Sequence, residues 1–277
     1  MTDSPRMPRR VAPNGWTALT LAGAAVGLAI SGPVAAAGPD NGPEKPWLAQ
    51  ATEGGEGGEA GEAGAAAGGD EVVDFLTDLG LLEGHLRAGV ALYRDGRADQ
   101  AAPHMTRPQD DSYDELSYHL ADFGAEGFAE DLTALANAVA GGEPADAVEA
   151  TLAKVLKDID EAREHARAPQ AAEAQAMVAI LRRAADAYGD AVTDGKVAEP
   201  EDYQEAWGFV EAARAQAAQM AGEDDAAEKT FGETALAALD EAREALPDIA
   251  PEGLTPGDAS ILHAAAAKIE LAAYKLK

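Results

Sequence analysis

The 277-residue chain contains no cysteine. It therefore has no disulfide, no thiolate metal site and no cysteine nucleophile, and its stability depends on the burial of apolar side chains. It also lacks a Gly-rich phosphate loop with its Lys, and the sharp turn that exposes a serine nucleophile. Because no set of nucleophile, base and orienting residue can be assembled, we expect a protein that is not an enzyme.

Basic residues are scarce as well. There are 21 Lys and Arg against 50 Asp and Glu, which gives a formal net charge of −29. This charge opposes binding to phosphate backbones, so we expect no nucleic acid partner. An acidic surface is typical of proteins from saline surroundings, and also of proteins that meet cations or basic proteins. Of the two interpretations, adaptation to saline surroundings is the favoured one.

The first seventy residues contain little that could form a core. Residues 1–40 have the pattern of a signal peptide, in which three arginines precede the apolar run "WTALTLAGAAVGLAI" and "PVAAAG" offers small residues for cleavage. An uncleaved anchor is the alternative, but the run is short for a membrane span. Residues 41–70 carry a Gly, Glu and Ala repeat that predicts a disordered acidic linker. We therefore expect an exported, periplasmic protein with its folded domain over residues 71–277.

Apolar residues recur every three or four positions from residue 71 onward, which indicates helices, and hardly any segment alternates as a strand would. The first helix is expected to run from residue 71 to a stop at Gly96. Further helices are expected after Ser112, over 128–139, from Pro144 through Ile159, around 177–188 and 203–217, and over 231–246 and 261–276. The sequence thus predicts an all-α protein, an up-and-down helical bundle of about six to eight helices.

The stretch "HMTRPQDDSYDELSYHL" is rich in metal-ligating residue types. Glu115 and His119 stand four residues apart and project from one side of a helix, as two ligands of one metal ion would. His104, in a preceding loop, can supply a third ligand. The alternative is a capping box, in which the Ser112 side chain accepts from the Glu115 amide and Glu115 reaches back to the Ser112 amide. In that case His119 is a histidine at the rim of the bundle.

A second candidate is the pair Glu83 and His85. Two positions on a helix are about 200° apart, so these side chains point to opposite sides and cannot chelate one ion unless Gly84 breaks the helix. Glu83 falls within an apolar stripe, where a carboxylate must be paired, protonated or ligating. The metal ligands expected in two or more partial sites are Glu83, His85, His104, Glu115 and His119. If these ligands form one site, it is expected where Glu83, His104 and His119 converge.

A third candidate is "DAVTDGKVAEPE", which partly fits a calcium-binding loop. Asp190, Asp194 and Glu201 fall at positions one, five and twelve of that loop. Val192 stands where the third position needs an oxygen ligand, and Pro200 stands where the second helix should already have begun. The favoured alternative is therefore an Asp-Gly turn between two helices, with Pro200 in the first turn of the second helix.

The segment "YGDAVTDGKVAEPEDYQEAWGFV", residues 188–210, resembles part of the extracytoplasmic helical region of bacterial high-affinity iron permeases. The matching residues are Tyr188, Val192, Asp194, Gly195, Lys196, Val197, Asp202, Tyr203 and Phe209. The acidic membrane helices of the permeases have no counterpart in the sequence. The resemblance therefore implies a stand-alone relative of the soluble region, and the remainder of the chain resembles uncharacterised exported α-helical proteins.

Taken with the candidate ligands, the resemblance implies an exported accessory or storage protein that binds a metal ion, iron by resemblance, and catalyses no reaction. The partners expected are the metal cation and a membrane transporter or another periplasmic protein. The alternative is a structural or interaction protein without metal, whose polar residues are helix caps and boundary residues.

Overall fold

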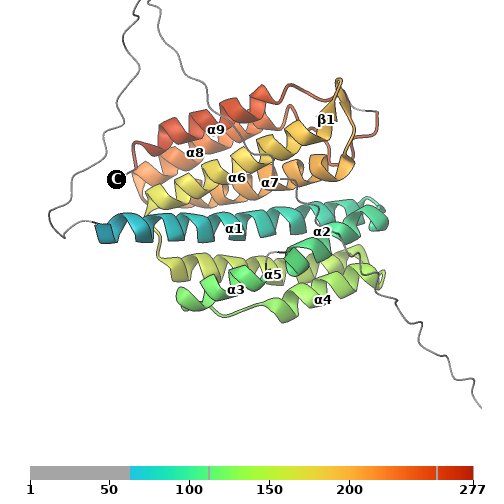
Figure 1. The fold of residues 1–277 in the computed structure, drawn as a ribbon, viewed down its shortest axis with the longest axis horizontal. Coiled ribbons are helices and arrows are strands. Elements are labelled where there is room, and N and C mark those ends of the chain that lie inside the picture. The colour runs from blue at the N-terminus through green and yellow to red at the C-terminus, as the bar shows by residue number, and fades with distance from the viewer. Residues whose placement is uncertain (1–62, 112, 254, 277) are drawn as a thin grey trace, which may run out of the picture. The chain divides into compact units, whose positions relative to one another are not determined.

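The computed structural model describes residues 63–111, 113–253 and 255–276 (Figure 1). The expected signal peptide and most of the expected linker lie outside these residues. In the described part the chain forms nine helices and one short hairpin, so the all-α prediction is confirmed. Helix α1 (Ala63–Arg94) begins before residue 71, because the alanines at its start favour a helix.

Helix α1 lies between two groups of helices (Figure 1). One group comprises α2 (Ala98–Asp111), α3 (Tyr113–Asp122), α4 (Ala129–Ala140) and α5 (Ala145–Ala166). The other comprises α6 (Gln170–Ala191), α7 (Pro200–Gly222), α8 (Ala226–Ala242) and α9 (Ser260–Ala273). The strands β1 (Val192–Thr193) and β2 (Lys196–Val197) connect α6 to α7.

Helices α6 to α9 form a four-helix bundle, in which each helix packs on the next and α9 returns to α6. The core of this bundle contains many alanines, which allow close helix packing but bury little apolar area per residue. Tyr188 and Tyr203 are its largest fully buried side chains. The Tyr188 hydroxyl donates to the carbonyl oxygen of Gly257 at 3.0 Å, which ties α6 to the segment before α9.

A second core joins α1 to helices α2 to α5, with Phe75, Leu79 and Leu86 contributed by α1. Glu83 is buried beside it, and its carboxylate accepts from Arg163 on α5 at 2.5 Å and from Arg87 at 2.6 Å. The sequence left Glu83 paired, protonated or bound to a metal, and the structure shows it paired with arginines. Removing one partner of a buried ion pair typically costs several kcal/mol of stability. The Glu83–Arg163 pair therefore fastens α1 to α5.

The segment around His104 is helical, where a loop was expected. Two prolines, Pro103 and Pro108, lie inside α2 and cannot donate helical hydrogen bonds, so the local sequence disfavours a helix. Ala101 and Met105 are buried, and α2 packs along α1, so tertiary burial outweighs the local preference. This helix accounts for the difference between the nine helices described and the six to eight expected.

The hairpin between α6 and α7 adopts the Asp-Gly turn of the favoured alternative. Val192 pairs with Val197, and the turn residues Asp194 and Gly195 have φ values of 53° and 70°. Glu201 lies in the first turn of α7, where its carboxylate pairs with Arg107 at 2.7 Å.

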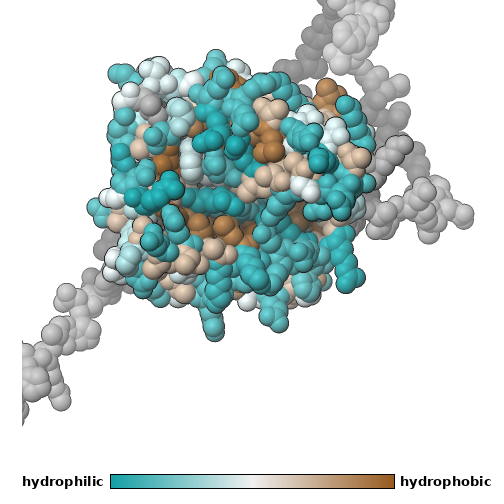
Figure 2. Space-filling model, turned by 180° about the vertical axis from the view of Figure 1, so that it is seen from behind, coloured by the Kyte–Doolittle hydropathy of each residue, from teal (hydrophilic) through white to brown (hydrophobic). Residues whose placement is uncertain are grey.

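The face seen in Figure 2 is largely hydrophilic, and its apolar residues gather in small separate patches. Among the residues that the structure describes, no helix combines the length and apolar character needed to cross a membrane.

A backbone contact between two glycines sets the distance between α1 and α7. A Cβ atom added to Gly208 would lie 2.2 Å from the carbonyl oxygen of Gly84, and one added to Gly84 would lie 3.0 Å from the amide nitrogen of Phe209. Backbone atoms cannot rotate away as a side chain can, so both positions require glycine at this spacing. The contact brings His85, next to Gly84, close to Glu205, one turn before Gly208.

We expect Gly208→Ala to lower the free energy of unfolding by about 3 kcal/mol, because the added methyl group forces the two helices apart. Gly189→Ala in α6 is the matched control, since nothing lies within 4 Å of its added Cβ. That variant should raise the free energy of unfolding by up to about 1 kcal/mol through helix propensity. Urea denaturation measures both, and equal stability of the two variants would refute the close contact.

Candidate metal centre

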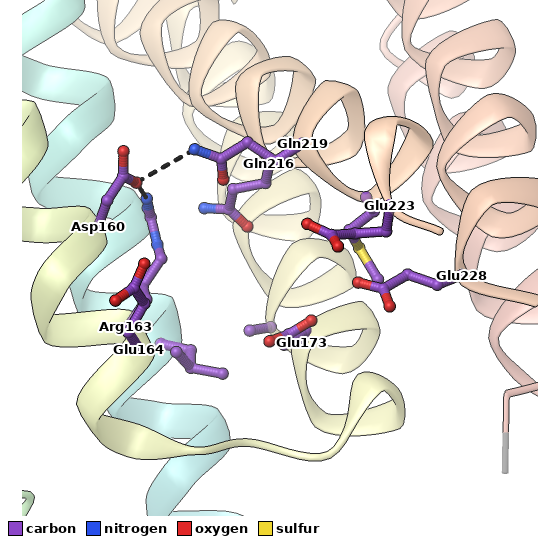
Figure 3. Close-up of a pocket in the computed structure, with 11 residues that line it drawn as sticks. Asp160, Arg163, Glu164, Glu173, Gln216, Gln219, Glu223 and Glu228 are labelled. Atoms are coloured by element: carbon purple, nitrogen blue, oxygen red, sulfur yellow. Dashed lines mark hydrogen bonds and ion pairs between the residues drawn. The ribbon is translucent and has the colours of Figure 1, made fainter. Parts of the chain in front are cut away.

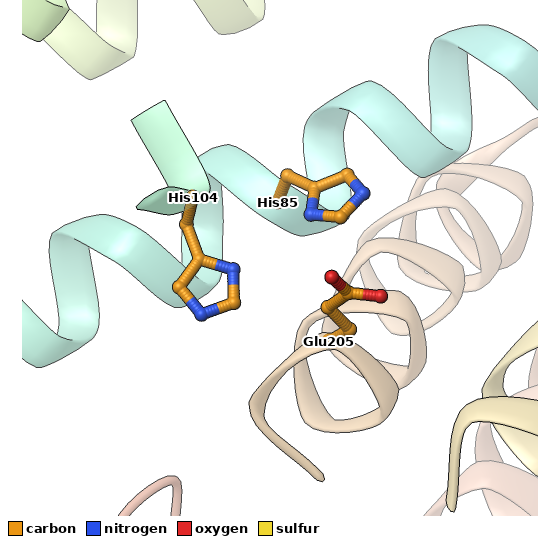
Figure 4. A group of neighbouring side chains, drawn as sticks. All are labelled: His85, His104 and Glu205. Atoms are coloured by element: carbon orange, nitrogen blue, oxygen red, sulfur yellow. The ribbon is translucent and has the colours of Figure 1, made fainter. Parts of the chain in front are cut away.

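His85, His104 and Glu205 come together from α1, α2 and α7, and their side chains point toward one another (Figure 4). Each offers one ligand atom, and these atoms all lie within 4.8 Å of one another. The two imidazole rings have their centroids 6.0 Å apart. Within the described part of the chain, this is the group of three His, Asp or Glu side chains that could hold a metal ion.

His104 is held in one orientation by a chain of two side-chain amides, Gln204 and Gln100. The Gln204 amide nitrogen donates to the Gln100 side-chain oxygen at 2.8 Å, so the Gln204 oxygen is free to accept from the His104 Nε2–H at 3.1 Å. Both His104 and Gln204 are 2 % exposed. This arrangement leaves the lone pair on His104 Nδ1, and metal-binding histidines are commonly oriented through the nitrogen that does not ligate.

His85 carries a buried nitrogen without a partner. Its Nδ1 atom makes no hydrogen bond among the described residues, while the ring lies edge-on to Phe209 with centroids 5.1 Å apart. Burial lowers the pKa of His85 to about 3, and the positive charges of Arg107 and Arg183 act in the same direction. The imidazole is therefore neutral at physiological pH, which is the form that binds metal.

Glu205 is half-buried and carries the negative charge of the group. Burial raises the pKa of this carboxyl, and the neighbouring Arg107 opposes that effect. Arg107 pairs with both Glu205 and Glu201, so one guanidinium supplies the counter-charge for two carboxylates of α7.

The donor set fits a divalent transition metal. Two histidines and one carboxylate occur as ligands of Zn²⁺ and of non-haem Fe²⁺. Metal–ligand bonds of about 2.1 Å place tetrahedral ligand atoms about 3.4 Å apart. The separations of up to 4.8 Å therefore need small side-chain rotations to close around an ion. Three protein ligands also leave at least one coordination position open.

The structure brings together His85 and His104 of the five ligands expected from the sequence, and it adds Glu205. Glu83 points instead toward Arg163 of α5, which confirms that it and His85 face different ways. His119 lies at the rim, with Nδ1 3.8 Å from Asp78 Oδ2, and Glu115 is exposed. The expected convergence of Glu83, His104 and His119 is wrong, because α2 directs His104 toward α7.

A cavity of about 370 Å³ is lined by carboxylates where α5, α6, α7 and α8 meet (Figure 3). Its acidic residues are Asp160, Glu164, Glu173, Glu223 and Glu228. Burial, together with the negative charge of Glu228, raises the pKa of Glu173 to about 7. Arg163 pairs with Asp160 at its edge, at 2.9 Å.

The fold and these side chains define an all-helical protein with a candidate His/His/Glu metal centre. Residues 163–276 match a family described as the iron permease-associated 4-helix bundle domain. The match covers the end of α5 and all of α6 to α9, and it includes residues 188–210, so the resemblance to iron permeases noted in the sequence is confirmed. No curated protein and no solved structure matches the chain.

The matched segment contains only one of the three candidate ligands. Glu205 lies within it, whereas His85 and His104 belong to helices that precede it. The candidate centre is therefore formed between the four-helix bundle and the helices added on its N-terminal side.

We expect Glu173→Gln to change how stability depends on pH. A carboxyl with its pKa raised from 4.5 to about 7 contributes stability that is present below pH 4.5 and lost as the pH rises through 7. Glu173 is only partly buried, so solvent screening reduces the effect, and the variant should gain about 1 to 2 kcal/mol relative to the parent as the pH rises from 5 to 8. Denaturation at both pH values measures the gain. Glu244→Gln, at an exposed site, controls for charge loss, and an equal gain in that variant would contradict the assignment.

Proposed function

We propose that this protein binds one divalent transition metal ion through His85, His104 and Glu205. The observation that carries the proposal is the meeting of these side chains from three helices, with the buried Nδ1 of His85 lacking any partner among the described residues. A buried polar atom without a hydrogen bond costs free energy, and a metal bond would remove that cost.

Iron is the metal that we propose for the site. The matched family is described as iron permease-associated, and two imidazoles with one carboxylate suit Fe²⁺. The same ligands bind Zn²⁺ and Cu²⁺ more tightly in the usual affinity order, so metal supply outside the cytoplasm would decide which ion is carried.

The role that we propose is that of a non-catalytic accessory protein for a membrane iron transporter. A three-ligand centre suits the carriage of one ion better than storage, which needs many sites. The net charge of −29 supports this role, because an acidic surface raises the local concentration of cations. We further propose that the protein acts in the periplasm, on the basis of the signal-peptide pattern of residues 1–40.

A second candidate function is that of an interaction protein without metal. One observation favours it. Arg107 already pairs with Glu205, so the carboxylate has a counter-charge before any metal binds. A metal ion must compete with this guanidinium, and the binding experiment below decides between the two functions.

We expect Fe²⁺ under anaerobic conditions, and Co²⁺ or Zn²⁺ as substitutes, to raise the melting temperature of the purified protein. An ion present at 100 times its dissociation constant adds about 2.7 kcal/mol to the stability of the native state. His104→Gln should weaken binding by at least about 100-fold, because it removes a ligand. Calorimetric titration and thermal melting measure these effects.

His119→Gln is the matched control, since it removes a histidine at the rim of the same domain. Its metal affinity should stay within about twofold of the parent, because His119 is not among the three converging side chains. If none of the three ions shifts the melting temperature, or if both histidine variants lose affinity equally, the proposed function is refuted.

A further inference from the structure

A cavity of about 280 Å³ adjoins the candidate metal centre, and it carries cationic side chains. Its lining includes His85 and Glu205, together with Arg107, Arg183 and Asp78. It is smaller than most drug-binding pockets and has the size for a small organic molecule. Two of the three proposed ligands thus face a space that a further ligand of the metal could occupy.

Arg183 is the unusual member of this lining. It is exposed on α6, and among the described residues it makes no hydrogen bond or ion pair. The chain has 50 acidic and 21 basic residues, so carboxylate partners are abundant. The adjacent Arg182, by contrast, pairs with Glu270 at 2.8 Å. An unpaired cation at a cavity is available to an anion.

Arg107 would also have a donor free for an anion once a metal binds. Its Nη1 donates to Glu205 and its Nη2 pairs with Glu201. If Glu205 turns to ligate a metal ion, Arg107 keeps Glu201 and loses one acceptor. The donor so released lines the same cavity as Arg183.

The balance of charge indicates the class of anion. A divalent ion, Arg107 and Arg183 bring four positive charges. Glu205 and Asp78 in the lining bring two negative charges, and Glu201, which stays paired with Arg107 outside the lining, brings a third. The net excess is one positive charge, which one monocarboxylate neutralises and a doubly charged phosphate would exceed. A carboxylate also fits the planar donors of arginine and is itself a metal ligand.

We propose that a small monocarboxylate binds in this cavity as a further ligand of the metal, held by Arg183 and Arg107. This inference rests on the proposed metal site. The metal and the carboxylate would then bind cooperatively, and each would raise the affinity for the other by the same factor.

Co²⁺-loaded protein in carboxylate-free buffer tests the inference, with acetate as the probe and chloride at equal ionic strength as its control. The visible absorption of Co²⁺ responds to a change of ligands. We expect acetate, but not chloride, to change this spectrum saturably and to lower the Co²⁺ dissociation constant by at least about fivefold.

Arg183→Ala should raise the acetate dissociation constant at least about tenfold, because it removes the unshared cation. Without acetate, its Co²⁺ affinity should remain within about twofold of the parent, since Arg183 is not a ligand. Arg182→Ala, which removes the same charge from the neighbouring position, should leave acetate binding unchanged. Melting temperatures of both variants check that the exposed substitutions leave the fold intact.

The outcomes separate the two proposals. If Co²⁺ does not bind, both the metal site and the carboxylate site are refuted. If Co²⁺ binds but acetate leaves its spectrum and affinity unchanged, or if both arginine variants weaken acetate binding equally, only the carboxylate site is refuted.

Discussion

The backbone contact between Gly84 and Gly208 is the constraint on which the rest of the arrangement depends. It holds α1 against α7 closely enough to leave no room for a methyl group on either residue. Because α1 also forms part of the second core, the same contact fixes the group of α2 to α5 relative to the four-helix bundle. The candidate centre lies beside this crossing, so its ligands are positioned by a close backbone contact between α1 and α7.

The two acidic residues Glu83 and Glu205, which lie on opposite sides of α1, have different partners. Glu83 is buried and fully paired by two arginines, so it serves to fasten α1 to α5. Glu205 shares its arginine with a second carboxylate and lies beside two neutral imidazoles. One acidic residue is therefore satisfied by the protein alone, and the other has a partner that an ion can replace. This contrast supports a binding role for Glu205 and a structural role for Glu83.

Helix periodicity was enough to predict the fold class, because apolar residues recur every three or four positions. Glycines also mark the ends of α1, α3 and α4. Helix α2 was missed because Pro103 and Pro108 argue against a helix, and only its packing on α1 outweighs them. His85 and His104 were chosen for their chemistry alone. Glu205 was not found, since one glutamate among many acidic residues of α7 has no local signal. Glu205 can be identified as a candidate ligand only when the contact between Gly84 and Gly208 is known. Local sequence patterns do not predict this contact between residues far apart in the chain.

The position of the candidate ligands has a consequence for how the molecule unfolds. His85 and Glu205 are 120 positions apart in the sequence (205 − 85), and they belong to helices shared between two cores. An ion held by both would act as a reversible cross-link that closes a long loop in the chain, and long loops gain most from such closure. The loaded protein would then lose its two cores in one concerted transition, whereas the ion-free protein could open the group of α2 to α5 first.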